Sequence, residues 1–332
     1  MSAPTTRFCG VATSGHRAVR ATSGPAARFL APAPPERLAV LRILVGTYGV
    51  LWSLVRLPEH LRHIDQPLTR WQPIGVLSAV ANPLPDWLVV TLAVATPLLG
   101  LVYVAGWRFR TSGPAFAVSL LVLATVDSSW GQIFHTENLM VLHVGIVALA
   151  PAADALAINH RTLAGQTVRH GASDASLAGS TKEHVRYGWP VRLAAVVVVI
   201  VYVVAGLAKL RVAGLGWADG DVLRNLVAYD NLRKELLGDA YSPLGTRVVG
   251  VAWVFPPLAL TTLAVELGAW VALFGGRWRT AWVIAAWSFH VGVFALMAIL
   301  FPYQLSGIAF APLFRLERVA RVWRRHPLSP NG

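Results

Sequence analysis

The chain has 332 residues, of which 55% are hydrophobic and only 14% are charged. A water-soluble globular fold of this composition would leave too much apolar surface outside its core, so an ordinary soluble domain is excluded and a protein embedded in a bilayer is indicated. The net charge of +13 is spread over short loops and tails. This argues against nucleic acid as a partner, because a nucleic-acid-binding surface gathers its basic residues into one patch.

Residues 1–35 are rich in Arg, Ala, Ser and Pro and contain no acidic residue. They lack the long apolar core of a secretory signal peptide, so we expect a disordered basic N-terminal tail. An organelle transit peptide, which has a similar composition, is the alternative. Cys9 is the only cysteine, which excludes an intramolecular disulfide and a cysteine-based metal site.

Apolar stretches long enough to span a membrane follow this tail. A crossing helix needs about 20 mostly apolar residues, and seven stretches approach that length: 38–57, 86–106, 114–131, 136–155, 190–210, 257–275 and 280–301. A weaker apolar piece, 303–314, is too short for a perpendicular crossing and is either a re-entrant segment or a short buried helix. We predict an all-α fold, a polytopic helical membrane bundle with seven or eight hydrophobic segments.

The charges of the loops predict the orientation of this bundle. With the N-terminus in the cytoplasm, the cytoplasmic side holds most of the basic residues and the opposite loops hold most of the acidic ones, as the positive-inside rule expects. The basic residues are Arg7, Arg17, Arg20, Arg28, Arg37, Arg108, Arg110, Arg161, Arg169, Lys182, Arg186, Arg277, Arg279 and those from Arg315 to Arg325; the acidic ones include Asp219, Asp221, Asp230, Glu235 and Asp239. We therefore expect a multi-pass protein of the plasma membrane with a cytoplasmic N-terminus.

One transmembrane domain is expected over residues 36–315, followed by a basic cytoplasmic tail over 316–332, and the chain has no internal repeat of the kind found in inverted-repeat transporters. The loop near 157–187 is polar and without periodicity, which predicts a flexible linker. The outer loop 211–247 contains a helical-looking stretch at 221–237. We expect that loop to form an ordered cap on the outer face.

Lys209 is the first ionisable residue that does not belong in lipid. It ends the stretch VYVVAGLAKL, in which Tyr202, Gly206 and Lys209 fall on one helix face. Snorkelling toward the lipid headgroups is the alternative explanation. However, the chain has three lysines against 26 arginines, and lysine rather than arginine is the residue that can lose its proton and serve as a base. The composition thus favours a functional lysine.

Three further sites carry ionisable side chains inside or beside apolar stretches. Glu266 and His290 each lie near the middle of a segment, where a hydrogen bond between helices is the alternative to a functional role. His135 and His143 lie at and below the outer entrance of the fourth segment. Ligands of one metal on a helix are usually three or four residues apart, so the spacing of eight argues against a shared ion, and no metal is expected.

Under the predicted topology, Lys209 and His135 lie near the outer surface, and Glu266 and His290 can reach the outer half of the same bundle. The site is therefore expected to face the extracytoplasmic side. Aromatic residues gather at the same boundary, which suits a flat lipid-soluble ring, although an interfacial aromatic belt explains them equally well. These residues are Trp130, Trp217, Trp253 and Phe255.

Three short motifs in this order resemble the horizontally transferred transmembrane (HTTM) domain, the membrane portion shared with vitamin K-dependent gamma-carboxylase. They are IFHTENL around His135, AGLAKL with Lys209 followed by Trp217, and the run from Glu266 through Phe289 and His290 to Phe301-Pro302-Tyr303. Their spacing matches over roughly residues 36–315. Specificity comes from their joint order, because each motif is short.

The resemblance implies that Lys209 is the base that deprotonates reduced vitamin K, whose oxygenation gives a strongly basic alkoxide. That alkoxide removes a proton from a substrate glutamate, and the carbanion captures carbon dioxide. His135 and His290 would belong to the same active region. We group the remaining polar and aromatic candidates as supporting residues: Glu266, Tyr202, His143 and Trp217. The implied cofactor is reduced vitamin K or menaquinone, a lipid-soluble quinone drawn from the membrane lipids.

Two departures limit this inference. Ala208 stands where the animal enzyme has a second lysine, and the sequence has no counterpart of the large lumenal domain that captures the protein substrate. Peptide carboxylation is therefore not expected, and the protein substrate is unknown. Whether the protein is an enzyme is left open: the first hypothesis is a quinol-dependent carboxylase or oxygenase of carboxy-lyase type. The alternatives are a non-enzymatic carrier or scaffold and a quinone-reactive redox partner without carboxylation.

Overall fold

The computed structural model describes residues 29–133, 135–158 and 183–325. Within these ranges the chain is helical and contains no β-strand. Most of the predicted N-terminal tail, most of the linker near 157–187 and the last residues of the C-terminal tail lie outside the described residues. The predicted all-α class is confirmed.

Six helical stretches are long and apolar enough to cross a membrane, by length and composition. They are α2 (Pro35–Val55), α4 (Asp86–Ala105), α5 (Phe109–Asp127), α8 (Val185–Ala213) extended by η5 (Gly214–Trp217), α11 (Phe255–Leu267) with η6 (Ala252–Val254) and η7 (Gly268–Phe274), and α12 (Gly276–Met297). The shorter elements are α3 (Leu57–Arg62), η1 (His63–Asp65), η2 (Leu68–Arg70), η3 (Gly75–Leu77), α6 (Asn138–Ala148), α9 (Asp221–Leu237), α10 (Pro243–Val248), α13 (Pro302–Leu305), η8 (Ile308–Leu313) and α14 (Glu317–Arg325). The helices are those of an integral membrane protein.

Two predicted segments differ from the structure in length. The fourth, expected over 136–155, forms only the 11-residue helix α6, and turns follow it. Pro151 explains the early end, because proline has no N–H for the next helical hydrogen bond. The weak piece at 303–314 forms α13 and η8, with Phe310 at 1% exposure. It is therefore a pair of short buried helices.

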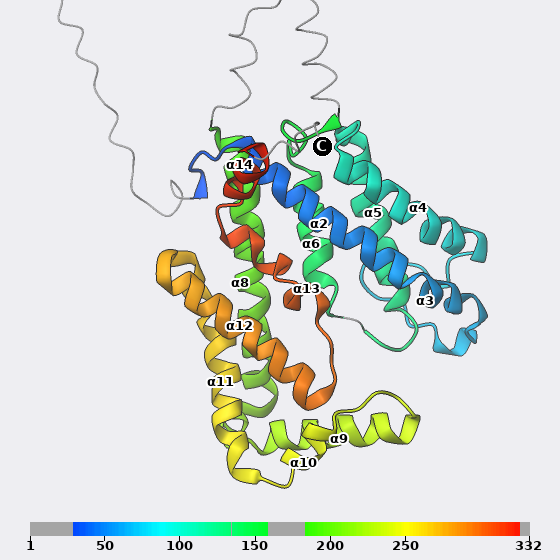
Figure 1. Ribbon diagram of the computed structural model, residues 1–332. Helices are drawn as coiled ribbons and strands as arrows, with labels where there is room; N and C mark the ends of the chain where they lie inside the picture. The colour runs from blue at the N-terminus through cyan, green and yellow to red at the C-terminus, as the bar shows by residue number, and fades with distance from the viewer. Residues whose placement is uncertain (1–28, 134, 159–182, 326–332) are drawn as a thin grey trace, which may run out of the picture.

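The helices form two groups joined through α6 and α8 (Figure 1). Helices α2, α4, α5 and α6 pack together on one side, and α8, α11 and α12 on the other, while α9 and α10 lie across one end of the second group. Helix α9 matches the stretch predicted at 221–237. The loop 211–247 is thus ordered and caps one end of the second group, while its position on the outer face stays a prediction.

The starts of α2, α8 and α14 share the other end of the bundle. Ala33 pairs with His184 through two backbone hydrogen bonds, and Arg37 forms an ion pair with Glu317 at 2.7 Å. Figure 1 places α3, α9 and α10 away from this end. The start of α2, the residues just before α8 and the start of α14, all of which we predict to be cytoplasmic, therefore meet at one end of the molecule. The side of the membrane that this end faces stays a prediction.

Arg42 is a buried cation that the sequence analysis did not consider. Its side chain is 0% exposed in the middle of α2, and its guanidinium donates to the carbonyl oxygens of Ala152 and Leu156, each at 2.6 Å, and of Val104 at 3.2 Å. These carbonyls belong to the end of α4 and the turn after α6, where the last carbonyls of a helix lack partners. Arg42 thus ties three helices together.

Candidate functional site

Lys209 and Glu266 form an ion pair between α8 and α11. Lys209 Nζ lies 2.5 Å from Glu266 Oε1, and the two side chains are 23% and 4% exposed. Gly206 permits this approach, since a Cβ there would lie 2.8 Å from Leu267 Cδ2 and 3.1 Å from Glu266 Cβ. The small residue one turn before Lys209 is therefore the notch into which the acid-bearing turn of α11 packs.

Trp217 covers the amine from the end of α8. Lys209 Nζ lies 5.4 Å from the centre of the indole ring, within the range of a cation–π contact. The indole N–H donates to Thr262 Oγ1 at 3.1 Å, and this bond fixes the ring against α11. The ammonium is thus held between a carboxylate and an aromatic face.

His290 and Tyr202 form a second polar pair on the same face of α8. The Tyr202 hydroxyl lies 2.6 Å from His290 Nε2, and both side chains are buried. His290 Nδ1 and Glu266 Oε2 are likewise buried, and among the described residues neither atom has a hydrogen-bond partner. Buried polar atoms are seldom left unsatisfied. These two atoms therefore leave positions on this face of the bundle where a further polar group can form hydrogen bonds.

His135 and His290 both contact the ring of Phe301. Phe301 lies 4.7 Å from the His290 ring and 5.7 Å from the His135 ring, centre to centre. His135 itself is exposed, in the connection between α5 and α6. The structure thus groups His135, His290 and Tyr202, and separately groups Lys209, Glu266 and Trp217. Tyr202 and Lys209 share one helix, so the two groups are neighbours on α8.

His143 has a structural environment. Its Nε2 lies 3.2 Å from the carbonyl oxygen of Ala194, so this nitrogen carries the proton and donates it. Nδ1 then accepts from the Tyr303 hydroxyl at 2.7 Å. Both ring nitrogens are occupied, and the imidazole joins α6, α8 and α13.

An apolar cavity of about 270 Å³ lies between α9, α11 and α12. Its wall includes Thr262, the residue that accepts from Trp217, and Val265, which precedes Glu266. The cavity therefore ends against the residues that support the Lys209 pair. Its remaining lining is mostly aliphatic, as a site for a lipid-soluble molecule requires.

The cap holds the end of α12, which forms part of the wall of this cavity. Asn231 on α9 donates to the carbonyl of Leu296, Lys234 to that of Met297, and Ser242 to that of Ala295. These are the last carbonyls of α12, which would otherwise lack partners. The loop between α8 and α11 is ordered for this reason.

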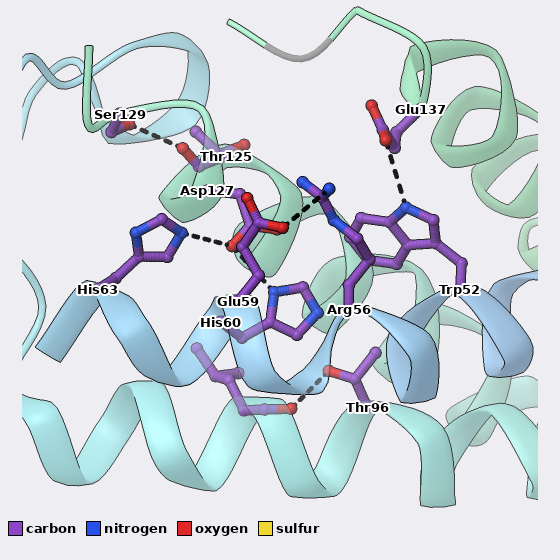
Figure 2. Close-up of polar contacts among 11 residues, drawn as sticks. Trp52, Arg56, Glu59, His60, His63, Thr96, Thr125, Asp127, Ser129 and Glu137 are labelled. Atoms are coloured by element: carbon purple, nitrogen blue, oxygen red, sulfur yellow. Dashed lines mark hydrogen bonds and ion pairs between the residues drawn. The ribbon is translucent and has the colours of Figure 1, made fainter. Parts of the chain in front are cut away.

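One cluster of titratable residues was not predicted from the sequence: His60, His63 and Asp127 (Figure 2). Both imidazoles lie within hydrogen-bonding distance of the same Asp127 oxygen. Two signals in the sequence point to it: an aspartate at the end of an apolar segment and two histidines three residues apart. Neither suffices alone, because the acid and the histidines are more than 60 positions apart.

Within the described residues, no three His, Cys, Asp or Glu side chains are arranged to hold a metal ion. No protein-family model matches the chain, and the searches of curated proteins and of solved structures found no match either. The function must therefore be argued from the residues of the site.

Proposed function

We propose that the protein is an integral membrane enzyme that transfers a proton between the Lys209–Glu266 pair and a lipid-soluble quinol. The reaction would be similar to that of vitamin K-dependent gamma-carboxylase, with reduced vitamin K or menaquinone as cofactor. The observation that supports this most directly is the 2.5 Å contact between an amine and a carboxylate inside an apolar bundle. Such a pair can hold its proton on either atom, because in low dielectric the neutral and ionised forms approach one another in free energy.

The neighbouring groups suit this chemistry. The apolar cavity beside Thr262 offers space for a quinol outside the aqueous phase. In the proposed step the amine, with its own proton on Glu266, accepts a proton from a quinol hydroxyl, and the indole of Trp217 stabilises the ammonium that forms. His290 and His135 would polarise oxygen-bearing groups at the same outer end. We place the site on the extracytoplasmic side of the plasma membrane.

The test is turnover of reduced vitamin K or menaquinol by the full chain in proteoliposomes with oxygen. Epoxide formation is followed with and without labelled bicarbonate, which separates carboxylation from oxygenation alone. Lys209→Ala should lower the rate about 10²- to 10⁴-fold, the usual effect of losing an acid–base group. Lys209→Arg keeps the positive charge without the readily transferred proton and should be nearly as slow. Arg211→Ala, at an exposed position two residues further on, is the matched control.

One observation favours a non-enzymatic carrier or scaffold: the same ion pair joins α8 to α11. A purely structural pair can be replaced by apolar residues of similar volume without loss. The double variant Lys209→Met with Glu266→Leu would then keep both stability and function, although each single variant destabilises. Equal turnover of the wild type and Lys209→Ala would contradict the enzyme proposal.

A further inference from the structure

The cluster of His60, His63 and Asp127 lies in the other half of the bundle from Lys209. His60 and His63 project from one side of α3 and η1 toward Asp127, the last residue of α5 (Figure 2). His60 Nδ1 is 2.9 Å and His63 Nε2 is 3.1 Å from Asp127 Oδ1. His60 and Asp127 are 0% and 2% exposed. Burial of a carboxylate requires partners that compensate its charge.

The hydrogen positions follow from the chemistry of the carboxylate. An ionised carboxylate only accepts, so both imidazole nitrogens that face it must carry protons. His60 is then protonated at Nδ1 with Nε2 bare, and His63 is protonated at Nε2 with Nδ1 bare. In the same way, a buried aspartate fixes the orientation and tautomer of a catalytic histidine in hydrolases.

The net charge of the cluster favours the binding of one more proton. Arg56 and Glu59 form an ion pair at 3.0 Å beside it, which adds no net charge. With two neutral imidazoles, Asp127 leaves the cluster with one negative charge at the C-terminal end of α5, where the helix dipole disfavours an anion. One added proton makes the cluster neutral.

The surroundings of the two rings decide which of them takes that proton. His60 Nε2 is buried and has no hydrogen-bond partner among the described residues, so a proton there would be an unsatisfied donor. His63 instead lines a cavity of about 60 Å³, together with Trp71, Trp130 and Asp86. That volume is enough for water.

We propose that His60, Asp127 and His63 form a proton-binding site, separate from the Lys209 pair, in which His63 exchanges one proton with water in this cavity. The proton moves from hydronium to His63 Nδ1 and leaves a water molecule. The Asp127 carboxylate stabilises the imidazolium, and His60 is a positioning residue that fixes the carboxylate. This inference does not depend on the proposed quinol chemistry.

The experiment is nitrogen NMR of the full chain with ¹⁵N-labelled histidine in lipid nanodiscs, with His60→Gln and His63→Gln used for assignment. As the pH is lowered through the range where imidazoles protonate, His63 should gain its second proton while His60 keeps a protonated Nδ1 and a bare Nε2. Proton exchange with water should be fast at His63 and slow at His60. Uptake by His60 instead, or the common Nε2-protonated tautomer at His60, would overturn the proposal.

A matched pair of variants tests the role of the carboxylate. At the pH where His63 is half protonated in the wild type, Asp127→Asn should lower the ratio of protonated to neutral His63 about tenfold or more. Asp86→Asn, which removes a carboxylate that lines the cavity, should change it much less. Equal effects of the two variants would contradict the assignment. If Asp127→Asn does not fold, the wild-type tautomers and exchange rates decide the matter.

Discussion

Arg42 in α2 and Lys209 in α8 are both cations of long apolar helices, and their partners differ in kind. Arg42 is fully buried and donates to backbone carbonyls at the ends of neighbouring helices. Lys209 is partly exposed and faces the carboxylate of Glu266. A carbonyl oxygen holds a cation but takes no proton at ordinary pH, whereas a carboxylate can do both. The chemistry of the partner, rather than the depth of burial, therefore distinguishes a candidate for catalysis from a structural charge.

The largest expected effect is that of removing the structural cation. Arg42→Met should lower the free energy of unfolding by about 3–5 kcal/mol, because several buried carbonyls lose their donor at once. The measurement is unfolding in mild detergent, with Arg62→Met at an exposed position of α3 as the control. A fully stable Arg42→Met would show that the carbonyls find other partners and that Arg42 is not needed to hold the helices together.

A smaller effect is expected from closing the notch beside Lys209. Gly206→Ala places a methyl group 2.8 Å from Leu267 Cδ2, so the Leu267 side chain or its turn of α11 must move away from α8, at a cost of about 1–3 kcal/mol. The wider spacing should also lengthen the Lys209–Glu266 contact and lower quinol turnover. Gly145→Ala in α6 is the control, since a Cβ there meets nothing within 4 Å. Equal behaviour of the two variants would argue against a tightly packed pair.

The smallest effect concerns a third cation, Arg37, whose partner Glu317 is a carboxylate at the other end of the bundle. Burial alone would raise the pKa of Glu317. The hydrogen bonds from Arg37, a backbone hydrogen bond and the charges of Arg37 and Arg321 together outweigh it, so that pKa is lowered below its usual value. A lowered folded-state pKa gives stability that is present above the ordinary glutamate pKa. That stability is lost as the pH falls through the lowered value.

The contribution should stay below about 1 kcal/mol, as is usual for ion pairs near a surface. It is measured as the protection factor of the α14 amides, the intrinsic hydrogen-exchange rate relative to the observed rate at each pH. This factor should fall in acid for the wild type and stay constant over that window in Glu317→Gln. An unchanged acid response in the variant would assign the loss of protection to another group.

Much of the fold could be predicted from local sequence. Uncharged stretches gave the long helices, and the stretch 221–237 became α9 with the same bounds. The end of α6 was misjudged because hydrophobicity continues past Pro151, whereas the helix ends three residues before this proline. For the candidate site, the helical spacing of Tyr202, Gly206 and Lys209 correctly put them on one face. Their roles in catalysis stay predictions.

The sequence by itself therefore determined that the protein lies in a bilayer, that its fold is helical and which of its residues are too polar for lipid. These properties depend on composition and on short-range periodicity. Tertiary structure alone decided the partners: Glu266 for Lys209, backbone carbonyls for Arg42, and Asp127 for two histidines more than 60 residues away. Pairings across such distances depend on which helix faces pack together. That packing is a property of the whole bundle and leaves no local pattern in the chain.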